Sequence, residues 1–191
     1  MKLSRFVGVA GTNGSGKDTL GRVLEHEGYR AASLSDILRT EATKRGLEHT
    51  REHLSSISHE LRMELGEGAL SQRLIEEASA DEKLVITSLR VPGEVEAIQK
   101  RGGTIVWIDA DPHERYRRIL AAHRDRPTDE VSFEEFQRQE AAEMTPSEEG
   151  GGLNMAAVRD LADVTVLNDF ASKEDFETYL CQRFELGVSS E

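Results

Sequence analysis

Short apolar runs alternate with amphipathic stretches along most of the chain. Five runs have the length and apolar character of buried strands, at residues 5–10, 29–34, 84–87, 104–109 and 163–167. Between them, apolar residues three and four positions apart predict helices over 18–27, 37–45, 50–65, 69–80, 94–100, 112–120, 154–161 and 173–184. Because strands alternate with helices, the pattern predicts a parallel five-stranded sheet between two helix layers, a three-layer α/β/α fold.

Three polar residues predict where helices of the long segment after the second strand begin. Ser35 and Asp36 carry side chains that cap helix N-termini, so they predict a helix that starts at Ile37. Thr50, three residues before His53, predicts the start of the next helix in the same way. The segment 36–80 is therefore expected to be a helical insertion in the α/β core.

The segment between the first strand and the first helix is rich in glycine. Its sequence GTNGSGKDT has the Gly-x4-Gly-Lys spacing of a P-loop, whose backbone N–H groups curl around nucleotide phosphates. The N-terminus of the following helix adds partial positive charge, and Lys17 is expected to reach the β- and γ-phosphates of ATP. The predicted nucleotide-binding residues of this loop are Gly11, Asn13, Gly14, Ser15, Gly16, Lys17, Asp18 and Thr19.

The residue after the P-loop lysine departs from the usual motif. A serine or threonine is expected there because its hydroxyl binds Mg²⁺, but this chain has Asp18. Thr19 carries the nearest hydroxyl, so it is the predicted metal contact. Asp18 is expected in the first helical turn, where a carboxylate is favoured. ATP and Mg²⁺ are the expected cofactors.

Composition excludes several other classes of protein. Of 191 residues, 37% are hydrophobic, enough for one domain with a real core, and the net charge of −12 argues against broad binding to nucleic acid or an anionic membrane. Cys181 is the only cysteine, which excludes an intrachain disulfide and a cysteine-based metal cluster. The sequence shows neither a signal peptide nor an apolar run of membrane-spanning length. A cytoplasmic protein, monomeric or dimeric, is therefore expected.

Polar residues follow each predicted strand. Besides the P-loop, they are Ser35 and Asp36, the segment 88–90, the segment 109–111, and Asn168 with Asp169. Ligands of parallel α/β sheets bind beyond the carboxyl ends of the strands. We therefore expect these segments to converge on one cleft.

Several segments together resemble the nucleoside monophosphate kinase group of P-loop proteins, in particular dephospho-CoA kinase-like and deoxynucleoside monophosphate kinase-like proteins. The P-loop ends in GKDT, LSDILR at 34–39 is similar to the acceptor-site motif of adenylate kinases, and VITSLRVPGEVEAI at 85–98 is similar to a strand–Arg–Pro–Glu segment. Residues 152–169 resemble the stretch that leads into the base-binding loop. The matches span most of the chain, and only the P-loop is specific by itself.

The resemblance implies roles for particular residues. It implies the P-loop NTPase fold, with a core of 1–35, 81–111 and 153–191, an acceptor-binding helical insertion at 36–80 and a lid at 112–152. It assigns the acceptor to Ser35, Asp36, Arg39, Arg90 and Glu94, the nucleotide base to the loop at Asn168, and lid arginines to Arg118 and Arg124. With Lys17, the catalytic cations are then Arg90, Arg118 and Arg124.

The chain also departs from this family after its third strand. Thr87 and Ser88 stand where an acidic metal contact is often found, and Asp109 or Asp111 after the next strand is a candidate replacement. In the lid, the acidic run from Glu134 to Glu149 indicates a solvated face. Phe133, Phe136 and Met144 are expected to pin the lid to the core.

The function that these features favour is ATP-dependent phosphoryl transfer to a small phosphate-bearing acceptor, most simply a (deoxy)nucleoside monophosphate. A lid that excludes water suits such a kinase, because water competes with the acceptor. Two alternatives stay open at this point: a dephospho-CoA kinase-like activity, and a P-loop ATPase or regulatory nucleotide-binding module without kinase activity.

Overall fold

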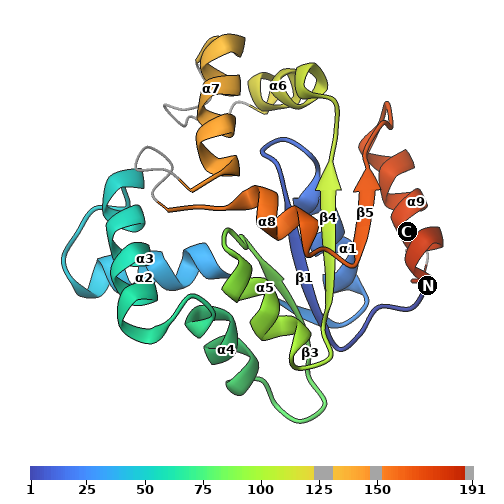
Figure 1. Cartoon of the computed structure of the whole chain (residues 1–191). Helices are drawn as coiled ribbons and strands as arrows, with labels where there is room; N and C mark the ends of the chain where they lie inside the picture. The colour runs from blue at the N-terminus through green and yellow to red at the C-terminus, as the bar shows by residue number, and fades with distance from the viewer. Residues whose placement is uncertain (123–130, 147–151, 188–191) are drawn as a thin grey trace.

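The computed structural model of the chain describes residues 1–122, 131–146 and 152–187. Its centre is a parallel sheet of five strands in the order β2-β3-β1-β4-β5 (Figure 1). The strands are β1 Phe6–Gly11, β2 Tyr29–Ser33, β3 Lys83–Thr87, β4 Thr104–Asp109 and β5 Val164–Leu167. The predicted parallel five-stranded sheet is thus confirmed.

Helices cover both faces of the sheet and one of its ends. They are α1 Lys17–His26, α2 Leu34–Lys44, α3 Arg51–Leu65, α4 Ala69–Glu76, α5 Pro92–Gln99, α6 Pro112–Ala121, α7 Phe133–Met144, α8 Met155–Asp160 and α9 Lys173–Phe184. Helices α1 and α9 pack on one face, and α5 and α8 cross the other, with α4 beside them (Figure 1). Helices α6 and α7 lie beyond the ends of the strands to which the arrowheads point. The three-layer α/β/α fold is confirmed.

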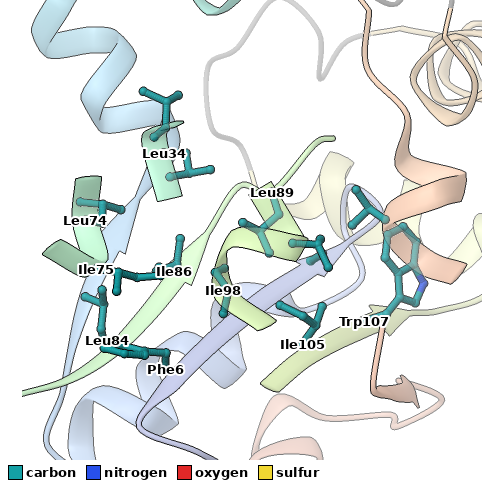
Figure 2. Close-up of a cluster of buried hydrophobic side chains, with 14 of the residues drawn as sticks. Phe6, Leu34, Leu74, Ile75, Leu84, Ile86, Leu89, Ile98, Ile105 and Trp107 are labelled. Carbon is teal, nitrogen blue, oxygen red and sulfur yellow. The ribbon is translucent and has the colours of Figure 1, made fainter. Parts of the chain in front are cut away.

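Alternate residues of the central strand, β1, belong to two separate hydrophobic clusters. Val7 and Val9 point to the cluster beneath α1 and α9, whereas Phe6 and Ala10 point to the cluster beneath α4, α5 and α8. Trp107 of β4 is fully buried in the second cluster, among side chains contributed by strands and helices (Figure 2). Burial on both faces explains why the three inner strands, β1, β3 and β4, are continuous apolar runs, whereas burial alternates along the edge strand β5.

The predicted cap of α2 is wrong. The helix begins at Leu34, so Ser35 and Asp36 lie inside its first turn, and Ser33 is the N-cap residue without a side-chain capping bond. The hydroxyl of Ser33 instead lies 3.0 Å from the hydroxyl of Ser88, which follows β3. A tertiary contact across two strand ends has therefore replaced the local cap. For α3 the prediction is confirmed, because the Thr50 side chain accepts a hydrogen bond from the His53 N–H.

The strand order determines where a ligand fits. The connection after β1 leads to the edge strand β2, whereas the connection after β3 leads past β1 to β4 on the other side, so the loops after β1 and β3 flank the topological switch point of the sheet. The loop after β1 is the glycine-rich segment. Within the described residues, none of the helices combines the length and the apolar content that crossing a bilayer requires.

Candidate functional site

The glycine-rich loop has a backbone that only glycine accommodates at two of its positions. Gly14 and Gly16 have φ angles of +77° and +97°, in the region that disfavours side chains. A Cβ on Gly14 would lie 2.6 Å from the carbonyl oxygen of Arg115, and one on Gly16 would lie 2.5 Å from Nδ2 of Asn168. The loop is therefore closely packed between α6 and the end of β5, in the curled form that the motif predicts.

Helix α1 starts directly at Lys17, and its N-cap residue, Gly16, provides no side-chain cap. No N-cap side chain therefore stands between the start of the helix and an anion, which the helix dipole favours there. Lys17 Nζ lies 3.2 Å from the carbonyl oxygen of Thr12, so the side chain arches back over the loop. The fully buried Ser15 hydroxyl has no hydrogen-bond partner among the described residues. These groups fit the phosphates of a nucleotide.

A pocket of about 360 Å³ opens beside the loop. Thr19, one of its lining residues, is 6% exposed, whereas its neighbour Asp18 is exposed. Three basic residues outside the predicted set also line the pocket, namely Arg22, Arg117 and Lys173. The predicted residues in its wall are Asn13, Gly14, Gly16, Lys17, Asp18, Thr19, Arg118 and Asn168.

Arg118 and Asn168 form hydrogen bonds that join the segments lining the pocket. The Arg118 guanidinium donates to the carbonyl oxygens of Asn168 and Phe170, each at 3.2 Å, and so joins α6 to the loop after β5. The buried Asn168 side chain donates from Nδ2 to the carbonyl oxygen of Ser15 at 2.9 Å. Its amide nitrogen thus holds the P-loop, and because Asn168 also lines the pocket, its contact with the nucleotide stays a prediction.

Of the two acids considered as metal contacts after β4, one lies at the loop. Asp109 Oδ1 accepts hydrogen bonds from the Thr12 hydroxyl and from the Ala110 N–H, both at 2.8 Å. Asp111 instead caps α6, because its carboxylate accepts from the N–H groups of His113 and Glu114. Asp109 is therefore the better placed of the two for a metal ion near the P-loop.

Arg90 lies in the loop between β3 and α5. Strand β3 is on the opposite side of β1 from β4 and β5. Its N–H donates to Glu94 Oε2 at 2.6 Å, and its carbonyl oxygen accepts from the Asn154 N–H at 3.0 Å. Its guanidinium forms a 2.6 Å ion pair with Glu143 of α7. The backbone of Arg90 is thus fixed on both flanks.

Glu94 lies beneath this loop and is only 1% exposed. Its carboxylate accepts hydrogen bonds from the N–H groups of Arg90 and Val91 and pairs with Arg62 of α3 at 3.3 Å. Burial raises the pKa of Glu94, while Arg62 and the two N–H groups act in the opposite direction. The predicted contact of Glu94 with substrate is therefore wrong for this structure, because the carboxylate is enclosed and already satisfied by the protein.

Other predicted acceptor residues lie apart from the P-loop pocket. Asp36 and Arg39 form an exposed 2.5 Å ion pair on α2, and Ser35 is half-buried in the same turn. Ser35, Arg39 and Arg90 are absent from the wall of the 360 Å³ pocket. Asp36 instead borders a separate hollow of about 320 Å³ between α2, α4 and the edge strand β2.

Ser88 is strained. Its φ angle of +67° lies in the left-handed region, which costs energy for a residue with a side chain and is often found at functional sites. Thr87 and Ser88 are both half-buried, at the position where an acidic residue was expected. The strand end next to β1 therefore presents hydroxyl groups rather than a carboxylate.

Helix α7 is joined to the site by two carboxylates that sequence reasoning missed. Arg115 of α6, only 3% exposed, pairs with Glu140, with Nη2 and Oε2 2.8 Å apart. Glu143 pairs with Arg90. The interpretation of the acidic run as a solvated face is thus wrong for these two residues. They share one helix face with buried Phe136, at intervals of four and three positions, and that spacing is the signal in the sequence.

Aromatic contacts hold the start of α7. The Phe136 ring is buried 5.6 Å from that of Tyr116, Phe133 stacks on His113 at 4.2 Å, and Met144 packs against the main hydrophobic cluster. The two phenylalanine rings thus attach α7 to α6, which is itself part of the predicted lid, and of these three side chains Met144 is the one that reaches the core cluster. Arg124, predicted as a lid arginine, lies outside the described residues.

Comparisons with known proteins agree with this geometry. The profile of the AAA domain family matches residues 7–143. Among solved structures, a shikimate kinase from Bacteroides thetaiotaomicron has a TM-score of 0.57 at 18% identity, covering 95% of this chain and 98% of its own. A shikimate kinase from Acinetobacter baumannii in complex with shikimate has a TM-score of 0.54 at 16% identity, covering 94% and 92%. These likenesses show that the fold is that of P-loop kinases.

Sequence relatives match at higher identity over nearly the whole chain. A UPF0200 protein of Pyrobaculum aerophilum is 32% identical over 177 residues, which cover 92% of this chain and 94% of the relative. A UPF0200 protein of Hyperthermus butylicus is 33% identical over 172 residues, covering 88% and 87%. The chain therefore belongs to the UPF0200 family, which here carries an AAA-type P-loop domain with a kinase-like fold.

Proposed function

We propose that the protein is an ATP-dependent kinase that transfers a phosphoryl group to a small phosphate-bearing acceptor, most simply a nucleoside monophosphate. The observation that carries the proposal is a pair of cationic sites on either side of β1. On one side, Lys17 and the P-loop border the basic 360 Å³ pocket; on the other, Arg90 stands on a fixed backbone after β3. Phosphoryl transfer needs such cations around two anionic groups more than it needs covalent chemistry.

In this proposal, the P-loop N–H groups and Lys17 bind the β- and γ-phosphates of ATP. Arg118 and the loop at Asn168 form the wall against which the rest of the nucleotide lies. Lys17 stabilises the charge that spreads over the transferred group in the transition state. Arg90 and Arg39 bind the acceptor, and a bidentate guanidinium suits its phosphate better than an ammonium does. Ser35 and Asp36 shape the acceptor site beside Arg39.

A magnesium ion would be held by oxygen ligands close to the P-loop. Thr19 supplies a buried hydroxyl in the pocket wall, and Asp109 supplies a carboxylate that is already bonded to Thr12. This donor set fits Mg²⁺, which binds proteins through oxygen ligands and keeps several waters. When bound, the ion would neutralise charge on the phosphates.

A second candidate function is a P-loop ATPase or nucleotide-binding regulator. The hydroxyl-bearing pair Thr87 and Ser88, in place of an acid, is the observation that favours it. Within the kinase proposal, dephospho-CoA is an alternative acceptor, since the same arginines suit any phosphate group. Release of ADP that no acceptor changes would favour the ATPase.

Alanine at Arg90 or Arg39 tests the acceptor assignment. We expect either change to raise the acceptor KM roughly tenfold or more, because each removes a charged hydrogen bond to phosphate. The affinity for ATP should stay near that of the wild type, since neither side chain borders the P-loop pocket. Steady-state kinetics with a nucleoside monophosphate, together with calorimetric titration of ATP, give both quantities.

The control for these variants is Arg101→Ala, because Arg101 is an exposed arginine with a 3.9 Å surface ion pair to Glu76. This variant should leave both the acceptor KM and the affinity for ATP unchanged. Equal loss of ATP binding in the Arg39 and Arg90 variants would contradict the assignment of these residues to the acceptor.

A further inference from the structure

We propose that Glu143 occupies the acceptor's place on Arg90, and that an acceptor phosphate binds by displacing this carboxylate from the guanidinium. This inference rests on the proposed function, because it assigns the anion site at Arg90 to the acceptor. It makes Glu143 a residue that controls access to the site, and it makes phosphate-bearing acceptors the class of substrate that the site admits.

The first argument is that Arg90 combines a rigid backbone with an exchangeable side chain. Its N–H and carbonyl groups are bonded to Glu94 and Asn154 on the two flanks, so the residue itself stays in place. Its guanidinium is 34% exposed and meets Glu143 through Nη1 at 2.6 Å. A partly exposed ion pair contributes little net free energy, so another anion can replace its carboxylate.

The second argument is the contrast with the other carboxylate of the same helix. Glu140 pairs with Arg115, which is 3% exposed and also donates from Nε to the carbonyl oxygen of Ala110 at 2.9 Å. The Arg115 guanidinium also lies 5.5 Å from the Phe136 ring. Breaking a buried pair of this kind leaves an uncompensated charge, which is costly. Glu140 therefore anchors α7, while Glu143 is the contact that gives way.

The third argument concerns the position of the two contacts along α7. Phe136 and Glu140 hold the body of the helix against α6, and Glu143 lies one turn further, next to the final residue, Met144. Displacing Glu143 from Arg90 therefore leaves the body of the helix attached, and Met144 keeps its packing against the main hydrophobic cluster. Figure 1 shows this end of α7 directed toward the loops at the carboxyl ends of the strands.

The charge of the incoming group determines which molecules can make the exchange. A phosphate monoester carries between one and two negative charges at neutral pH and offers three acceptor oxygens, against two on a carboxylate. It therefore competes for a guanidinium more strongly than Glu143 does. A neutral acceptor offers no anion to the guanidinium and cannot displace Glu143.

The test compares Glu143→Gln with Glu135→Gln, the same substitution on the same helix. Glu135 pairs with Arg138 on the exposed side and has no contact with Arg90. Calorimetric titration with AMP, with adenosine as its uncharged counterpart, gives dissociation constants in the absence of ATP. We expect E143Q to bind AMP about threefold to fivefold more tightly than the wild type, the factor that a half-exposed ion pair represents. E135Q should match the wild type, and adenosine should not distinguish the variants.

Weaker or unchanged AMP binding by E143Q, or no AMP binding by any variant, would overturn the inference. Because these measurements involve no turnover, displacement without phosphoryl transfer would refute only the kinase proposal. Phosphoryl transfer with unchanged E143Q binding would refute only this inference.

Discussion

Replacing Lys17 by alanine is expected to lower kcat by about 10²–10³-fold, the cost of removing one preorganised charge from a phosphoryl-transfer site. Lys17 arches over the P-loop at the start of α1, where it borders the pocket. Its ammonium would act mainly in the transition state, when charge develops on the transferred group. The measurement is kcat with saturating ATP and acceptor, with thermal unfolding as a check of the fold.

Lys100→Ala is the matched control, because Lys100 is an exposed lysine with a 3.7 Å surface ion pair to Glu96. It should retain wild-type turnover. A Lys17 variant that folds normally and also turns over at the wild-type rate would remove the P-loop from the mechanism.

Replacing Glu94 by alanine is expected to lower the free energy of unfolding by about 3–5 kcal/mol. The substitution strips Arg62 of its partner and leaves the N–H groups of Arg90 and Val91 without an acceptor. Urea unfolding gives the change directly. Glu94→Gln keeps an oxygen for the backbone groups, so we expect a smaller loss.

Glu96→Ala serves as the control, because Glu96 is on the same helix α5 with an exposed side chain. It should change the free energy of unfolding by less than about 0.5 kcal/mol, as surface substitutions usually do. An equally small loss in Glu94→Ala would mean that the buried carboxylate does not stabilise the loop that carries Arg90.

The fold followed from the sequence because its signals are local. Continuous apolar runs such as β4, which matches its predicted bounds of 104–109, can only be strands buried on both faces. The P-loop is similar, since Gly16 and Lys17 are adjacent in the chain and their roles depend on the strand before them and the helix after them. Such features can be predicted without knowledge of tertiary contacts.

Roles that depend on distant partners were harder to predict. Arg90 and Glu143 are 53 positions apart, and no local pattern links them. The Asn168 amide contacts Ser15 across 153 positions, so its structural role in holding the loop could not be predicted from the local sequence. The cap of α2, predicted at Ser35 and Asp36, was wrong for a similar reason: the helix begins earlier, and the hydroxyl of its N-cap residue Ser33 pairs with Ser88 after β3.

The most direct test of the central claim follows the γ-phosphate of ATP itself. The purified protein is incubated with Mg²⁺ and ATP labelled in the γ-phosphate, and each nucleoside monophosphate or dephospho-CoA is added in turn. We predict that the label appears on one of these acceptors, that ADP forms in equal amount, and that the Lys17→Ala variant transfers almost none. Label released only as free phosphate, at a rate that no acceptor changes, would contradict the kinase assignment and favour an ATPase.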